Sequence, residues 1–256
     1  MAKDLETVRH LSDAASRTTK SLCRSYHPVI DESSIRELQK VLPLRYHHVL
    51  QDNGQLFSAV FRAVRKHMAR YDLSHDIRHI LRVLALAGRI LDAEDSDTKY
   101  NAKTIFLSAL LHDIPDPKYT PPGQNPTAAL TSILHNSGAS PSLMITITTI
   151  ATHISYRRET RDPASVQRVL LQYPELAIVQ DADRLDALGA IGIARVFAFG
   201  GAMRPGTGLE SCLEYLGERG EGVEALMKTS TGREMARERA RRIKEYRKWW
   251  EEEMNL

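Results

Sequence analysis

The chain has 256 residues, enough for one large domain or for a domain with an extension. Its composition, with 42% hydrophobic and 26% charged residues, is typical of a folded globular protein and excludes a disordered or fibrous one. The formal net charge of +3 is too small to indicate a basic arm that binds nucleic acid.

The start of the chain and the two cysteines favour a cytoplasmic protein. The first ten residues, MAKDLETVRH, lack the apolar core of a signal peptide, and no apolar run reaches the roughly 20 residues that span a bilayer. Cys23 and Cys212 form neither a disulfide framework nor a paired-cysteine metal motif, which fits a reducing compartment. Residues 1–50 show weak helical patterning, so we predict a helical extension there and one domain over residues 51–256.

Helical periodicity dominates the next part of the chain. Two sets of apolar side chains each fall on one helical face: Phe57, Val60, Phe61 and Val64, then Ile77, Ile80, Leu81, Leu84 and Leu91. Residues 101–112 are apolar enough for a buried helix. Because no run of alternating residues is bounded by hairpin turns, we predict an all-α fold.

A proline-rich stretch follows that buried helix. It contains Pro115, Pro117, Pro121, Pro122 and Pro126. This density of prolines predicts a stiff, irregular loop directly after the His112–Asp113 pair. Loops in such places often carry function.

Two Xaa-Pro pairs predict helix starts further along the chain. Ser140 before Pro141 and Asp162 before Pro163 each place a capping residue next to a proline at the first helical position. The segment between them, LMITITTIATHISY, is rich in β-branched residues, so a strand is the alternative to the helix that we predict.

The last third of the chain is also predicted to be helical. Residues 175–197 are interpreted as one or two buried helices, followed by a glycine-rich loop from Gly200 to Gly208. A charged terminal helix is predicted to begin near Ser230 or Thr231.

Several polar residues stand where packing alone does not explain them. His75 and His79 are four residues apart and share a helical face, while His112 ends an apolar helix. The run VQDADRLDALGA, which contains Asp181, places three carboxylates and Arg184 in an otherwise apolar helix. Convergence of these groups on a metal ion is one interpretation, and an ion pair with Arg184 is the other.

Four segments together resemble the HD-domain metal-dependent phosphohydrolases. They are HDIRHILRV (75–83), LLHDIPDPK (110–118), ATHIS (151–155) and QDADRLDALGAIGIARVFAFGG (180–201). The resemblance covers roughly residues 56–253 and is strongest to single-domain nucleotide hydrolases, some of which remove pyrophosphate from nucleoside triphosphates. It implies an HD-domain helical bundle.

The resemblance also implies a set of metal ligands, which map to His79, His112, Asp113 and Asp181. Two imidazoles and two carboxylates without a thiolate suit one divalent ion of a borderline or hard kind. We predict Mn²⁺ first, with Fe²⁺, Co²⁺, Ni²⁺, Mg²⁺ and Zn²⁺ as alternatives. Such an ion lowers the pKa of a bound water from 15.7 towards about 7 and polarises a phosphoryl oxygen.

Further roles follow from the same resemblance. Asp116 corresponds to an acidic residue that orients or deprotonates the attacking water in several HD hydrolases, although it could instead cap the loop. His75, Lys118 and Arg184, with Arg157 or Arg158, are predicted to neutralise substrate phosphate. His153 is predicted to lie near the metal or to bind phosphate, with burial in the core as the alternative.

We therefore predict a nucleotide phosphohydrolase, most simply one that releases pyrophosphate from a nucleoside triphosphate. Its partner would be a small-molecule phosphate ester or nucleotide, with no nucleic acid or membrane, and a homo-oligomer is compatible with the sequence. Three alternatives stay open: a dinuclear HD iron oxygenase, a cyclic-nucleotide or alarmone phosphodiesterase, and a non-catalytic nucleotide-binding HD module. The oxygenase requires two more histidines, which His135 and His153 supply in number. The place of the first is occupied instead by Asn125, Pro126 and Thr127.

Overall fold

The computed structural model describes residues 30–71, 74–94, 100–116, 120, 123, 125–204, 206 and 208–255. The described residues form helices and no strand, which confirms the all-α prediction. The elements are α2 (Glu32–Gln39), the 3-10 helix η1 (Leu44–Tyr46), α3 (His47–Asp52), α4 (Gly54–Met68), α5 (Ile77–Ala93), α6 (Ala102–Leu111), α7 (Pro126–Asn136), α8 (Pro141–Ala151), α9 (Tyr156–Arg161), α10 (Pro163–Gln172), α11 (Glu175–Asp186), α12 (Gly189–Met203), α13 (Gly208–Ala225) and α14 (Ser230–Met254). Within these ranges, no single helix has both the length and the apolar character needed to cross a membrane.

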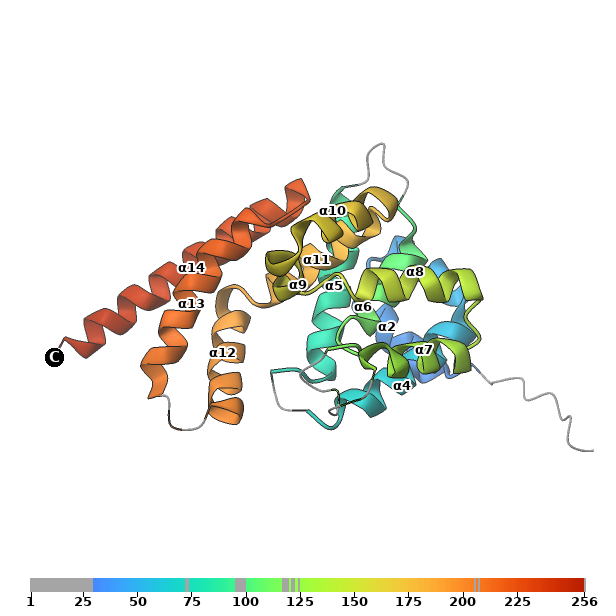
Figure 1. Cartoon of the computed structure of the whole chain (residues 1–256), viewed down its shortest axis with the longest axis horizontal. Coiled ribbons are helices and arrows are strands. Elements are labelled where there is room, and N and C mark those ends of the chain that lie inside the picture. The colour runs from blue at the N-terminus through green and yellow to red at the C-terminus, as the bar shows by residue number, and fades with distance from the viewer. Residues whose placement is uncertain are drawn as a thin grey trace, which may run out of the picture.

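Three helices form the centre of the molecule. α5 packs against both α6 and α11, and α4 packs against α6 (Figure 1). Helix α6 is buried on every side from Thr104 to Leu111, as its apolar sequence predicts, whereas α4 buries only the face that carries Phe57 and Phe61. The helix ends that surround this centre position the polar residues described below.

The segment rich in β-branched residues is a helix. Ser140 caps α8 by accepting a hydrogen bond from the backbone N–H of Leu143, and Pro141 occupies the first turn. The hydroxyl of Thr146 donates to the carbonyl of Ser142 one turn earlier, a bond that threonine makes readily in a helix. Tertiary packing and a good cap thus override strand propensity.

The two ends of the glycine-rich loop predicted from Gly200 to Gly208 are helical instead. Helix α12 continues to Met203 and α13 begins at Gly208. A Cβ atom at Gly200 would lie 2.4 Å from Sγ of Cys212, so this glycine permits α12 and α13 to pack closely. Gly200 therefore serves close helix packing. Composition alone does not distinguish such a glycine from one in a flexible loop.

The two ends of the described chain differ in how they join the centre. Leu38 of α2 and Leu50 of α3 are fully buried in the same hydrophobic cluster as α4 and α6. Residues 1–29 lie outside the described ranges, so the separate extension over residues 1–50 stays a prediction. At the other end, α12, α13 and α14 form a group that extends away from α7 and α8 (Figure 1). Helix α14 begins at Ser230, as predicted, and Thr229 is its cap.

Candidate metal centre

The first donor stands in the opening turn of α5. Asp76 caps this helix by accepting a hydrogen bond from the backbone N–H of His79 at 3.0 Å. The His79 side chain is 1% exposed, and its Nδ1–H donates to Oδ2 of Asp186 at 2.8 Å. Because Nδ1 carries the proton in this bond, the lone pair of Nε2 is directed to the opposite side of the ring.

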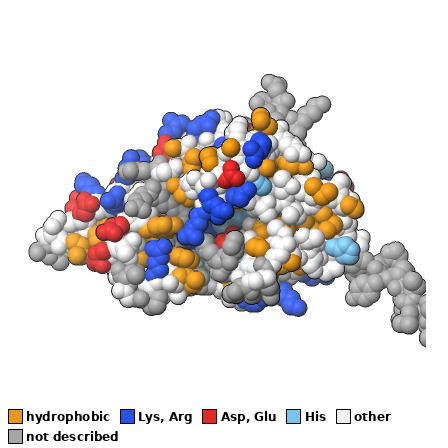
Figure 2. All heavy atoms as spheres, in the orientation of Figure 1, with side chains coloured by type: hydrophobic (Ala, Val, Ile, Leu, Met, Phe, Trp, Pro, Cys, Tyr) orange, Lys and Arg blue, Asp and Glu red, His pale blue; other side chains and the backbone are white. Residues whose placement is uncertain are grey.

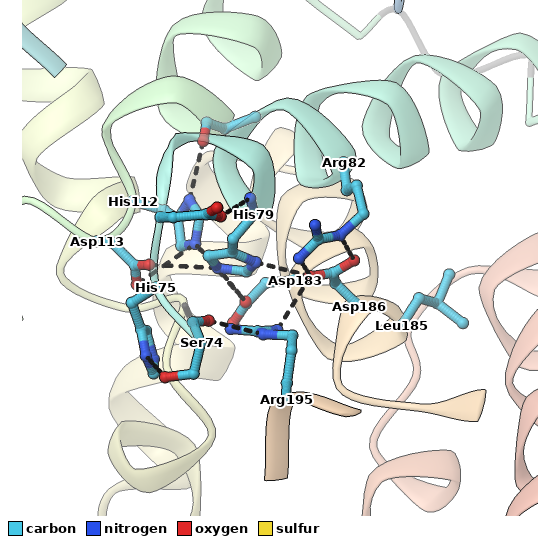
Figure 3. Close-up of polar contacts among 12 residues, drawn as sticks. Ser74, His75, His79, Arg82, His112, Asp113, Asp183, Leu185, Asp186 and Arg195 are labelled. Carbon is cyan, nitrogen blue, oxygen red and sulfur yellow. Dashed lines mark hydrogen bonds and ion pairs between the residues drawn. The ribbon is translucent and has the colours of Figure 1, made fainter. Parts of the chain in front are cut away.

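The second and third donors follow the end of α6. His112 is the C-cap of this helix, and its Nδ1–H donates to the carbonyl of Ala109 at 2.8 Å, which again leaves Nε2 as a donor atom. The Nε2 atoms of His79 and His112 lie 3.1 Å apart. The Asp113 carboxylate oxygens lie 3.2 Å from Nε2 of His79 and 3.4 Å from Nε2 of His112. These three side chains form a group with the geometry of a metal site (Figure 3).

A second carboxylate, from α11, is the fourth member of the group. Oδ1 of Asp183 lies 3.6 Å from Nε2 of His79 and 3.6 Å from Nε2 of His112. The group therefore offers two nitrogen and two carboxylate ligands from three different helices or their ends. This donor set suits a divalent ion of the kinds that carboxylate and imidazole select together.

The electrostatics of the group favour positive charge at its centre. Burial lowers the pKa of His112, but Asp113 and Asp183 outweigh burial and raise that pKa to about 9. Burial likewise raises the pKa of Asp183, yet the hydrogen bond and charge of His112 hold it well below the usual value. Oδ2 of Asp113 is buried and accepts no hydrogen bond. A bound cation would satisfy that oxygen and compensate both carboxylates, so the residues present fit a divalent metal ion.

Asp181, which the resemblance implied as the fourth ligand, lies on another side of α11. Its fully buried carboxylate accepts hydrogen bonds from the backbone N–H and the hydroxyl of Thr229, both at 2.7 Å, and from the N–H of Lys228 at 2.9 Å. Asp181 thus binds the start of α14, where backbone N–H groups favour an anion. Residues two apart on a helix point about 200° apart, so Asp181 and Asp183 cannot face the same group.

A shell of charged residues surrounds His79. Asp186, at the end of α11, accepts from Nε of Arg82 at 2.7 Å and from a guanidinium nitrogen of Arg195 at 3.0 Å (Figure 3). Neither Asp183 nor Asp186 was identified from the sequence. Their spacing of three residues was the available signal, because it places both carboxylates on one helical face.

His75, predicted to bind substrate, and Asp116, predicted to act on the attacking water, lie close to the donors. The rings of His75 and His79 are 5.9 Å apart between centroids, and Nδ1 of His75 shares a 2.6 Å hydrogen bond with the Ser74 hydroxyl. The backbone N–H of Asp116 donates to the carbonyl of Asp113 at 3.2 Å, which folds the loop back beside the donors. Lys118 lies outside the described residues.

Arg184 and His153 do not join the donors. The Arg184 side chain is 2% exposed, and its guanidinium binds the carboxylate of Glu159 and the carbonyl of Leu226. The prediction that Arg184 neutralises substrate phosphate is wrong because the side chain is buried against these partners. His153 shares one hydrogen bond with the Ser165 hydroxyl at 3.1 Å and another with the Thr149 carbonyl at 2.7 Å, so it links α8 to α10.

The histidines that a second iron would need are likewise separated from the donors. His135 is exposed on α7 and contacts Asn136 at 3.4 Å, while His153 is engaged as described. Asn125 caps α7, with Pro126 at the first helical position. These placements favour the hydrolase over the dinuclear oxygenase.

The surface near the donors is hollowed and carries basic side chains. Figure 2 shows a recess near the middle of this face in which histidine and acidic side chains are visible. Lys and Arg side chains gather along its edge, over the region of α9. A basic rim beside a metal centre suits an anionic substrate.

Comparison with known proteins identifies the same family as the four sequence segments do. The HD domain family model matches residues 76–188. The chain is 33% identical to the Bacillus subtilis protein YpgQ over 172 residues, which cover 64% of this chain and 77% of YpgQ. The crystal structure of YpgQ in complex with ADP superimposes with a TM-score of 0.59 at 29% identity, covering 75% of this chain and 97% of that one. An HD-superfamily hydrolase from Bacillus thuringiensis matches with a TM-score of 0.52 at 26% identity, covering 77% and 95%.

Proposed function

This chain belongs to the HD superfamily of metal-dependent phosphohydrolases, and we propose that it hydrolyses nucleoside triphosphates to nucleoside monophosphates and pyrophosphate. The observation that carries this proposal is the convergence of His79, His112 and Asp113 on one point. The ADP bound to YpgQ favours a nucleotide over other phosphate esters. The basic edge of the recess is consistent with a polyphosphate.

We propose that Asp183, and not Asp181, is the fourth metal ligand. Asp183 lies at 3.6 Å from both histidine donors, whereas the carboxylate of Asp181 is already satisfied by the start of α14. A divalent ion held by this set would activate a water molecule and polarise a phosphoryl oxygen, and Mn²⁺ is the ion we test first.

Residues beside the donors would accept the proton of the attacking water and contact the substrate. Asp116 is the proposed proton acceptor, because the turn after His112 returns it towards Asp113. Burial raises the pKa of Tyr71; Arg70 lowers it, and the charges of Asp113 and Asp116 raise it. His75 lies beside His79 and is positioned to contact a phosphate oxygen.

The reaction balances with water as the only co-reactant. The water oxygen forms a bond to the α-phosphorus while a proton passes to Asp116. The bond between the α-phosphorus and the oxygen that bridges to the β-phosphorus breaks. Pyrophosphate leaves with that bridging oxygen, and the nucleoside monophosphate remains.

A panel of substrates tests the proposal. Protein stripped of metal and reloaded with Mn²⁺ is incubated with ribo- and deoxyribonucleoside triphosphates, cyclic nucleotides and alarmones, and the products are identified by phosphorus NMR. Nucleoside monophosphate with pyrophosphate is the expected pair, and His112→Ala should lose both Mn²⁺ and turnover. Release of orthophosphate, or turnover of cyclic nucleotides or alarmones alone, would overturn the proposed reaction. No turnover of any phosphate ester by the Mn²⁺-loaded protein would refute the proposed nucleotide hydrolysis.

A further inference from the structure

Two phenylalanines on α12 have different surroundings. Phe197 packs in the group of C-terminal helices, where its ring stacks on Trp250 at 6.0 Å and meets Tyr246 edge-on at 6.3 Å. Phe199, two residues later, is rotated by about 200° on the helix. Its ring contacts that of His75, with centroids 6.0 Å apart, on the side of the metal centre.

A series of ring contacts joins Phe199 to the metal donors. The His75 ring contacts both of the others, with its centroid 6.0 Å from that of Phe199 and 5.9 Å from that of His79. These two steps are of the size that separates the phosphates of a nucleotide from its base. A substrate with its phosphates at His79 can therefore reach Phe199 with its base.

The metal centre also fixes the position of α12. Arg195, one turn before Phe199 on the same helical face, donates to Asp186 at 3.0 Å and to the carbonyl of Ser74 at 2.8 Å. Asp186 in turn holds His79. Phe199 is thus attached to the same framework that orients the donors, as a pre-organised binding surface requires.

A cation lies beside the ring. The exposed guanidinium of Arg204 lies 6.0 Å from the centroid of Phe199 and 5.6 Å from that of Tyr215. Half-buried aromatic rings combined with an arginine are the groups that hold bases by stacking and cation–π contact.

We propose that Phe199, flanked by Arg204 and Tyr215, forms the nucleobase subsite of this protein, with the base stacked on the Phe199 ring. This inference rests on the proposed function, since it requires a nucleotide substrate. Stacking uses the π-face that every base has, so the subsite should accept both purines and pyrimidines. Selectivity for a nucleotide over inorganic polyphosphate would come from this ring.

The test compares ligands with and without a base. Affinities of ADP and inorganic tripolyphosphate are measured by calorimetry on the Mn²⁺-loaded wild type and on Phe199→Ala, Phe199→Trp and Phe197→Ala. We expect Phe199→Ala to weaken ADP binding about 5- to 150-fold while tripolyphosphate binding is unchanged. Phe199→Trp should restore ADP affinity, and Phe197→Ala should lower thermal stability without changing ADP affinity.

Other results would overturn the subsite. Equal losses for ADP and tripolyphosphate in Phe199→Ala would show that the ring supports the metal centre only, and unchanged ADP affinity would show that the base binds elsewhere. If Phe199→Ala fails to fold, Phe199→Leu takes its place with the same expectation. Wild-type turnover is measured separately, so wild type that binds ADP through Phe199 but hydrolyses no nucleotide would refute the proposed function and leave the subsite standing.

Discussion

Two faces of the single helix α11 use the same residue types for different purposes. One face carries Asp183 and Asp186, which face the histidine donors and hold His79 in place. The other carries Asp181 and Arg184, which attach the segment before α14 through Thr229 and the carbonyl of Leu226. One short run of charges therefore serves both the metal centre and the attachment of the C-terminal helices.

The two faces differ in how completely their charges are satisfied. Asp181 accepts three hydrogen bonds from Lys228 and Thr229 at 2.9 Å or less, and burial raises its pKa. Burial acts on Asp183 in the same direction, but His112 lowers its pKa strongly. A carboxylate that already accepts several hydrogen bonds from the protein, such as Asp181, has little tendency to bind a metal ion. A carboxylate that lies beside two imidazoles, such as Asp183, can still bind one.

The largest effect is expected from Asp183→Asn, with Asp181→Asn as the matched variant on the other face of α11. Asp183→Asn should weaken Mn²⁺ binding more than about 100-fold, beyond the loss typical of residues outside the ligand set. Asp181→Asn should keep Mn²⁺ affinity but lower the free energy of unfolding by about 1–3 kcal/mol, because one of the two oxygens that accept from Lys228 and Thr229 becomes an NH2 group that cannot accept.

Metal content of the folded proteins by mass spectrometry, and urea unfolding, check both variants. If Asp181→Asn lost the metal while Asp183→Asn kept it, the assignment of the two faces would be reversed.

A smaller effect is expected from Asp186→Asn, which tests how much the contact between Asp186 and Nδ1 of His79 contributes to the metal centre. The substitution removes the charge that fixes the imidazole tautomer, so Mn²⁺ affinity or kcat/KM should fall about 10- to 100-fold. Arg82→Gln is the control: it removes a cation bound to Asp186 and leaves the bond to His79, so its loss should be smaller. Equal losses in both variants would show that the ion pairs of Asp186 matter more than its contact with His79.

The smallest effect is the pH dependence of stability that arises from Glu159, the ion-pair partner of Arg184 on α11. Burial raises the pKa of Glu159, but Lys228 and Arg184 outweigh burial and hold it below 4.5. A lowered pKa means that the stabilisation is complete above about pH 4.5 and is lost as the pH falls through the pKa of the folded state. Urea unfolding of wild type from neutral pH to about pH 3.5 should therefore show a steeper loss of stability than that of Glu159→Gln. Parallel curves for the two proteins would contradict this role of Glu159.

The sequence by itself determined the features that depend on near neighbours. Capping residues followed by proline located the starts of α8 and α10, and helical periodicity located α4 and α5. His112 and Asp113 were identifiable because they stand together at the end of an apolar helix, and His79 because its segment resembles the HD family. Each of these signals is contained in one helix or one turn.

Tertiary structure decided which polar residues meet. Asp181, Asp183 and Asp186 have identical side chains within six residues. Only the rotation of α11 against α5 and α14 places Asp183 beside His79 and His112, and Asp181 at the start of α14. The same rotation buries Arg184 against Glu159 instead of exposing it to substrate. That rotation is set by packing between helices far apart in the sequence, so no local pattern fixes it, although a three-residue spacing shows which carboxylates share a face.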